Sequence, residues 1–147
     1  MKIVLQRVLE AAVVVDGKEI SRIGQGFLAF VGVTGTDTKN QAEILADKIA
    51  KLRIFADGAG KSNLSVADIG GEILIVSQFT LYADTRKGNR PSFVFAAPAQ
   101  LAEELYEYFI YCCQNRKEFA KTAAGIFGAD MKINLINDGP YTVVLEV

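Results

Sequence analysis

The segment at residues 72–80 constrains the fold of this chain more than any other. It opens with a charged residue and then carries apolar side chains at the successive positions 73–76, so both faces of a strand formed here would be apolar along this run. Successive side chains of a strand point to opposite faces, and a continuous apolar run therefore indicates burial on both. We predict a β-strand over residues 72–80 that is covered on both of its faces.

Shorter strand signals and two helical patterns lie around this segment. Asp16 and Gly17 separate two apolar runs and form a dipeptide typical of a hairpin turn. Asp37 is the expected N-cap of a first helix ending near Leu52, and Pro98 is expected in the first turn of a second helix. The apolar stripe of the second helix comprises Leu101, Leu105, Tyr108, Phe109 and Cys112. The other predicted strands cover residues 3–8, 11–15, 18–23, 27–33, 132–136 and 141–145.

Length and composition predict one folded domain. Several strands precede each of two helices within 147 residues, which favours a single α+β domain over residues 1–147 with antiparallel or mixed, barrel-like sheets. Half of the residues are hydrophobic, which supports a packed core. The net charge of −1 argues against broad electrostatic attraction to nucleic acid, although it leaves room for a local basic patch.

The cysteines and the absence of apolar segments indicate the compartment. Cys112 and Cys113 are adjacent, which suits neither an ordinary disulfide nor a zinc site, so we expect small buried side chains on a helix. The N-terminus meets charge too early for a signal peptide, and no apolar run approaches the roughly 18 residues of a membrane helix. We therefore expect a cytoplasmic protein that does not associate with membranes.

The chain contains no histidine, so its chemistry has to rely on hydroxyls, amides, backbone groups or the substrate. This excludes Ser-His-Asp and Cys-His systems, and no residue spacing supports a zinc site, so we expect neither a metal nor an organic cofactor. Two segments remain as candidates. Residues 77–84 place hydroxyls, an amide and aromatic rings at the end of the apolar strand, and residues 137–142 place a Gly-Pro step between two strands. Taken alone, each is better explained as ordinary strand or turn structure.

The combination of these segments is more specific than either alone. The first reads SQFTLYADTRKGNRPSF over residues 77–93, and the second reads NDGPYT over residues 137–142. Shorter characteristic stretches are QRV at residues 6–8, KLRIF at 51–55, NLS at 63–65, GGE at 70–72 and FGADM at 127–131. Together they resemble the D-aminoacyl-tRNA deacylase family over essentially the whole chain.

The resemblance implies a homodimeric enzyme that hydrolyses the ester between a D-amino acid and the 3′-terminal adenosine of tRNA, with the active site at the subunit interface. The implied catalytic residues are Ser77, Gln78, Phe79 and Thr80. The implied chiral filter is a cis Gly139-Pro140 step from the other subunit, supported by Arg7, Asn137 and Thr142. Its main chain would clash with any L side chain, while glycine, which has no side chain, would pass.

Two mechanisms remain open. Thr80 could attack the ester, but the sequence offers no base to activate it. We favour a route in which the neighbouring ribose 2′-OH, or a water that it holds, attacks while backbone N–H groups at Phe79 and Thr80 stabilise the oxyanion. We expect the adenosine to contact Phe127 and Met131, because unpaired bases stack on such surfaces. A basic trio, which either meets the tRNA backbone or forms a solvated loop, consists of Arg86, Lys87 and Arg90.

Two other functions are compatible with the sequence. One is a nucleic-acid-binding or replication-associated protein that uses the same fold without catalysis. The other is a threonine-dependent amidohydrolase that acts on D-amino acid derivatives lacking RNA. Hydrolysis assays with matched D- and L-aminoacyl-tRNA, and with a simple D-amino acid ester, distinguish the three possibilities.

Overall fold

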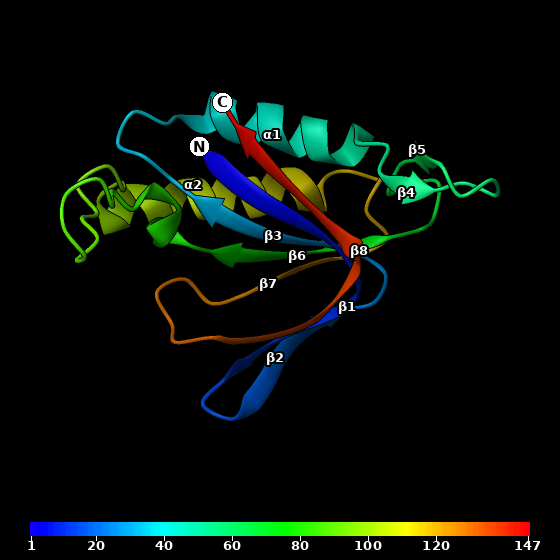
Figure 1. Ribbon diagram of the computed structural model, residues 1–147, viewed down its shortest axis with the longest axis horizontal. Helices are drawn as coiled ribbons and strands as arrows, with labels where there is room; N and C mark the ends of the chain where they lie inside the picture. Colours follow the sequence, from blue (N-terminus) through cyan, green and yellow to red (C-terminus); the bar gives the residue numbers. More distant parts are fainter.

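A curved mixed sheet forms the body of the protein, and the computed structural model describes all residues, 1–147. The strand order is β2-β1-β3-β6-β7, and β8 adds to this path by pairing with β1 (Figure 1). β3, β6 and β7 run parallel, whereas β2, β3 and β8 are each antiparallel to β1. The strands are β1 (Lys2–Val15), β2 (Lys18–Ile23), β3 (Gly26–Gly32), β6 (Glu72–Ser77), β7 (Thr122–Ala124), β8 (Lys132–Glu146) and a separate pair, β4 (Phe55–Ala56) and β5 (Ser62–Leu64).

The strand predicted at residues 72–80 is β6, which lies between β3 and β7. Its successive side chains enter two different hydrophobic clusters, with Ile73 in one and Leu74 in the other. Burial on both faces is therefore confirmed. The predicted end is wrong, because β6 stops at Ser77 and the chain turns into a short 3-10 helix, η1 (Phe79–Tyr82).

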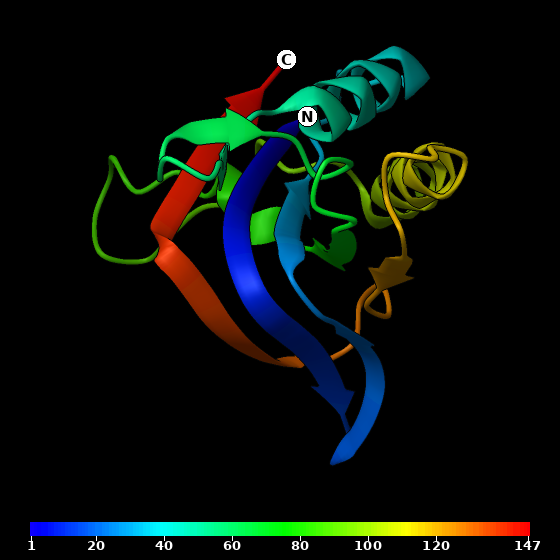
Figure 2. The same ribbon diagram turned by 90° about the vertical axis from the view of Figure 1, so that its right-hand side faces the viewer.

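Two separate hydrophobic cores lie on the two sides of the curved sheet. Both helices cover one side of the sheet, and the strands curl away from them on the other side (Figure 2). The larger cluster fills the space between sheet and helices and includes Phe27 and Phe109, both fully buried. The smaller cluster lies among β1, β2, β3 and β6 and consists of Val8, Ala11, Val13, Ile23, Leu28, Leu74 and Val76. The predicted α+β fold with a barrel-like sheet and two main helices is confirmed.

The first helix, α1 (Lys39–Lys51), begins one residue later than the predicted cap implies. Its N-cap is Thr38, whose amide donates to the side chain of Gln41 at 2.9 Å. Asp37, predicted as the cap, is instead buried, where its carboxylate accepts hydrogen bonds from the N-terminal ammonium group of Met1 and from the amide of Thr34. A tertiary ion pair thus replaces the local capping role.

The second helix, α2 (Ala99–Gln114), begins directly after Pro98, which is its N-cap and not part of its first turn as predicted. The helix also presents a slightly rotated face to the core. Tyr108 and Cys112 of the predicted stripe are only partly buried. The buried positions are Leu105, Tyr106, Phe109, Ile110 and Cys113. Neither α1 nor α2 has the length and apolar character needed to cross a membrane.

The C-terminal strands were predicted as two, joined by a Gly-Pro turn, and this prediction is wrong. Residues Lys132–Glu146 form the single strand β8, which pairs with β1 on both sides of the Gly-Pro step. The segments predicted at residues 3–8 and 11–15 are likewise one strand, β1. Because β1 continues without a turn, its partner β8 can also continue without one. The Gly-Pro step therefore interrupts the ladder between β1 and β8.

Candidate active site

An apolar cleft of about 540 Å³ opens at the C-terminal end of β6. Three residues of the predicted catalytic segment, Ser77, Gln78 and Phe79, line it. Both predicted adenosine contacts, Phe127 and Met131, line the same cleft. The structure therefore brings together residues that lie some fifty positions apart in the sequence. A cleft of this size is within the range that binds small ligands.

The turn after β6 exposes the candidate catalytic groups. Gln78 continues the ladder, with its amide donating to the carbonyl of Val31 at 2.8 Å. The first hydrogen bond of the turn is made by Leu81, whose amide donates to the Gln78 carbonyl at 3.3 Å. The amides of Phe79 and Thr80 precede that bond, and the first amides of a helical turn have no partner within it. They are free to stabilise negative charge on a ligand oxygen.

Thr80 is exposed, and its hydroxyl oxygen accepts a hydrogen bond of 2.5 Å from the side-chain amide of Gln78. An amide N–H is a donor and cannot take up a proton from the hydroxyl. Phe79 is 56% exposed and meets Phe93 edge to face at a centroid distance of 4.9 Å. The segment thus offers donors and aromatic surface without a basic group on the threonine.

Tyr106 lines the cleft and connects the segments that form its floor, although it belongs to none of the sequence motifs. Its hydroxyl donates to the carbonyl of Ile75 at 2.9 Å and lies 3.3 Å from the carbonyl of Gly125. Burial raises the pKa of Tyr106, so the hydroxyl remains a donor. Its ring lies 5.8 Å from that of Phe127. The helical spacing of α2 predicts that residue 106 lies next to a buried position, but only tertiary packing shows what its hydroxyl contacts.

Directly beside β6, the chain after β7 makes a close approach to Met131 at Gly125. A Cβ atom at this position would lie 2.5 Å from the sulfur of Met131. The glycine therefore lets the Met131 side chain reach the cleft. This contact connects β7 to the beginning of β8.

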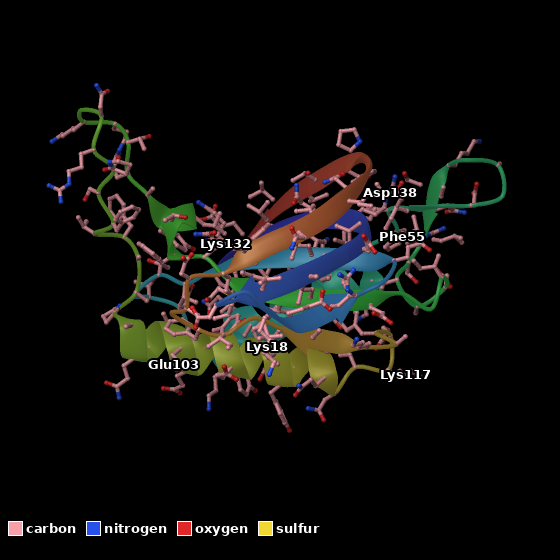
Figure 3. All side chains as sticks on the ribbon, turned by 90° about the horizontal axis from the view of Figure 1, so that it is seen from below. Lys18, Phe55, Glu103, Lys117, Lys132 and Asp138 are labelled. Atoms are coloured by element: carbon pink, nitrogen blue, oxygen red, sulfur yellow. The ribbon has the colours of Figure 1, made fainter.

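The segment containing Gly139 and Pro140 lies far from the cleft. Its peptide bond is cis, and both residues are exposed. The strand registers align Thr142 with Leu74 through β1 and β3, and Gln78 lies four residues beyond Leu74. At about 3.3 Å per residue and 4.8 Å per strand, this places Thr142 about 13 Å along the sheet and three strands across from Gln78, and Gly139 and Pro140 lie further away still. Asp138, labelled in Figure 3, lies at the end of the sheet opposite the turn after β6.

The Gly139-Pro140 segment forms a large bulge on β8. The β1 residues on either side of Arg7 pair with Asn137 and Thr142, so one residue on β1 faces four on β8. The Arg7 side chain fills this gap, with Nε donating to the carbonyl of Asp138 at 3.0 Å. Asn137 accepts from the amide of Tyr141 at 2.9 Å, and Gln6 donates to the Thr142 hydroxyl at 3.3 Å. All three residues predicted to support the loop lie around it.

The predicted basic trio lies on an exposed loop. Arg86, Lys87 and Arg90 are exposed, and the loop projects from the body of the protein after η1 (Figure 3). Arg86 forms an ion pair of 2.8 Å with Asp84. Hydrogen bonding from Arg86 lowers the pKa of Asp84 to about 2. One of the three cations is therefore partly neutralised by its neighbour.

Cysteines and acidic residues add no further site to this region. Cys113 is fully buried on α2 and Cys112 is partly buried, in agreement with the prediction of small apolar helix residues. The structure contains no group of three or more histidine, cysteine or acidic side chains arranged to hold a metal ion.

The chain matches the family model described as D-Tyr-tRNA(Tyr) deacylase over residues 4–146. Similar curated proteins include the D-aminoacyl-tRNA deacylases of Lactobacillus acidophilus, 52% identical, and Carboxydothermus hydrogenoformans, 49% identical, each over the full length of both chains.

Two solved structures are similar to this chain over nearly its whole length. The structure of a protein named "c-Myc DNA Unwinding Element Binding Protein" is 43% identical with a TM-score of 0.92, covering 100% of this chain and 99% of that one. A structure described as that of a probable eukaryotic D-amino acid tRNA deacylase has a TM-score of 0.86 over 99% of this chain and 98% of that one, but at 16% identity it shows the fold alone. The motifs, the matching model and the identity over the full length agree, and the chain belongs to the D-Tyr-tRNA(Tyr) deacylase family.

Proposed function

We propose that this protein hydrolyses the ester bond of D-aminoacyl-tRNA and releases the free D-amino acid and tRNA. The observation that carries the proposal is the turn at residues 77–80, which presents unpaired amides at the mouth of an apolar cleft. Such a site can bind a carbonyl oxygen as it becomes negative, and no ionisable side chain is needed for this. Membership of the family indicates which ester is bound.

The reaction needs a nucleophile that this site does not itself supply. Water, oriented by the ribose 2′-OH of the terminal adenosine, adds to the ester carbonyl while the amides of Phe79 and Thr80 hold the oxyanion. The intermediate then collapses, the bond between the carbonyl carbon and the ribose 3′ oxygen breaks, and that oxygen leaves with a proton from the attacking water. The products are the amino acid and tRNA. Thr80 as nucleophile is disfavoured, because its only side-chain hydrogen-bond partner is the amide donor of Gln78.

The cleft accommodates the terminal adenosine in this proposal. Phe127 and Met131 provide apolar surface for a base, and Phe79 and Phe93 border the catalytic turn. Lys87 and Arg90 would approach phosphates from the exposed loop, and such contacts make binding dependent on salt.

Chiral selection would come from a second copy of the chain. Within one subunit the Gly139-Pro140 segment cannot reach the cleft, yet it is exposed and firmly held by Arg7. Exposed apolar side chains on β1 and β8, including Leu9, Ile136 and Val144, favour a partner on this side of the sheet. With the substrate ammonium and ester fixed, an L side chain would point at the inserted main chain, which cannot rotate away. Glycine would not be rejected.

The test uses purified protein with matched D-, L- and glycyl-tRNA and with a D-amino acid ester lacking RNA. We expect rapid hydrolysis of the D-aminoacyl- and glycyl-tRNA only. Equal turnover of the simple ester would favour the amidohydrolase, and no turnover of any ester would refute the proposed activity. Sedimentation of the same sample measures the dimer, and a monomer that retains selectivity would refute selection by a partner subunit.

DNA binding without catalysis is a second candidate, favoured by the likeness to a 43% identical protein whose name describes binding to a DNA unwinding element. It predicts measurable binding of DNA duplexes or single strands at physiological salt. The net charge of −1 disfavours it, because binding to the DNA backbone relies on many cationic contacts. Competition between DNA and aminoacyl-tRNA for the protein distinguishes a shared site from an independent one.

A further inference from the structure

The bulge on β8 leaves the proposed chiral filter without the ladder that normally holds a strand. Four residues face one, whereas an ordinary bulge places two opposite one. Backbone groups that lose their ladder partners need other ones. The geometry of the Gly139-Pro140 main chain therefore depends on the side chains that fill the gap.

Arg7 supplies one of these contacts and also joins the bulge to another part of the chain. Its Nε donates to the carbonyl of Asp138, and Nη1 donates to the carbonyl of Ile54, in the segment between α1 and β4. Nε also lies 3.1 Å from a carboxylate oxygen of Asp138. The guanidinium is planar and its donors point in fixed directions, so these bonds form together in one orientation only.

The aromatic ring of Tyr141 also contacts the guanidinium. The guanidinium carbon of Arg7 lies over the Tyr141 ring, 4.8 Å from its centroid. The ring cannot follow a moving guanidinium freely, since the Tyr141 amide is bound to Asn137 and the ring packs against the main core. The Arg7 side chain is only 12% exposed, and a cation over an aromatic face is held more strongly where water is excluded.

The same contacts surround Gly139. A Cβ atom on this residue would lie 3.0 Å from the Tyr141 amide nitrogen and 3.2 Å from Nη2 of Arg7. The space beside Gly139 is therefore bounded by the Arg7 guanidinium and by the main chain and Cβ of Tyr141. A displacement of the guanidinium would change the space that this main chain occupies.

We propose that Tyr141 is a positioning residue for stereochemical selection, whose ring holds the Arg7 guanidinium in the orientation that fixes the Gly139-Pro140 main chain. This role rests on the proposed deacylation of D-aminoacyl-tRNA. It requires the ring and not the hydroxyl, because no hydrogen bond from the Tyr141 hydroxyl accompanies the stacking. A filter that moves by a fraction of an ångström admits small L side chains first.

The test compares Tyr141→Val with Tyr141→Phe. Valine removes the ring and keeps a residue that favours strands, and phenylalanine keeps the ring. The preference for D- over L-alanyl-tRNA should fall about 5- to 30-fold in Tyr141→Val, the range that the loss of one cation–aromatic contact corresponds to, and should be retained in Tyr141→Phe. An unchanged preference in Tyr141→Val, or an equal loss in both variants, would overturn the proposal.

A spectroscopic measurement separates this proposal from the activity itself. The Arg7 Nε–H signal, identified by its loss in Arg7→Lys, should show a ring-current shift and slow exchange with solvent in the wild type and in Tyr141→Phe. It should lose both in Tyr141→Val. An Arg7 signal unchanged in Tyr141→Val refutes the positioning role even if the protein proves inactive. A lower melting temperature with unchanged Arg7 signal and selectivity would show that the ring only fills space, which also refutes it.

Discussion

Replacing Tyr106 with phenylalanine removes a single oxygen from the floor of the cleft. The residue is 1% exposed, and its hydroxyl connects α2 to the carbonyls of Ile75 and Gly125. These two carbonyls are affected differently. The Ile75 carbonyl keeps the amide of Gly125 at 2.8 Å as a donor, whereas the Gly125 carbonyl accepts only from the hydroxyl.

The expected cost follows from this difference. One net hydrogen bond is lost and one partly buried acceptor is left without a partner, which together cost about 1–2 kcal/mol of unfolding free energy. In a protein of this size, each kcal/mol shifts the melting temperature by about 2–4 °C, so we expect a decrease of about 2–8 °C. The Gly125 segment carries Phe127, so KM for aminoacyl-tRNA should rise more than kcat falls.

Urea denaturation and steady-state kinetics measure both effects. Tyr111→Phe is the matched control, because Tyr111 lies on the same helix, is 58% exposed and makes no side-chain hydrogen bond in this structure. The control should change the unfolding free energy by less than about 0.5 kcal/mol. If Tyr106→Phe were as stable as the control, the hydroxyl would not tie the cleft together and the reasoning would be refuted.

Three further predictions concern the site and the core. Thr80→Ala should keep much of the deacylase activity in a single-turnover assay, and complete loss in a folded dimer would identify Thr80 as the nucleophile. Gly139→Ala should lower selectivity for D-aminoacyl-tRNA, because a φ of +134° is unfavourable for alanine by about 1–3 kcal/mol and the Cβ contacts Arg7; undiminished rejection of the L ester would contradict this. Burial raises the pKa of Tyr106, so the unfolded state loses this proton first, and stability should fall as the pH rises above about 10. Tyr106→Phe should lessen that fall in urea titrations between about pH 9 and 11, and an identical slope would count against burial as its cause.

Local patterns in the sequence predicted many elements correctly, and the errors share one cause. The apolar run at residues 73–76 predicts a doubly buried strand because burial on each face depends only on which side chains alternate. The prediction of Asp37 as the N-cap is wrong, because its carboxylate binds the amino terminus, a group distant in sequence. The prediction of a Gly-Pro turn between two strands is wrong because β1 is long enough to pair with both halves of β8.

The candidate site shows the same division. The motifs at residues 77–80 and 127–131 are recognisable in the sequence, and the structure places residues 77–79 and 127–131 in one cleft. The contribution of Tyr106 is not recognisable in the sequence, because a tyrosine on the apolar face of a helix resembles any other core residue. The stacking of Arg7 on Tyr141 was also not predicted, since it depends on the register at which β1 meets β8.

The sequence by itself determined the family, the two-faced burial of the central strand and the absence of a histidine base, because residue identity and short-range alternation are sufficient for each. Only the tertiary structure decided the distances between distant segments. It brings residues 77–79 and 127–131 together, and it holds Gly139 and Pro140 at the other end of the sheet. Strand register and sheet curvature set these distances, and both arise from the packing of two cores to which nearly every element contributes.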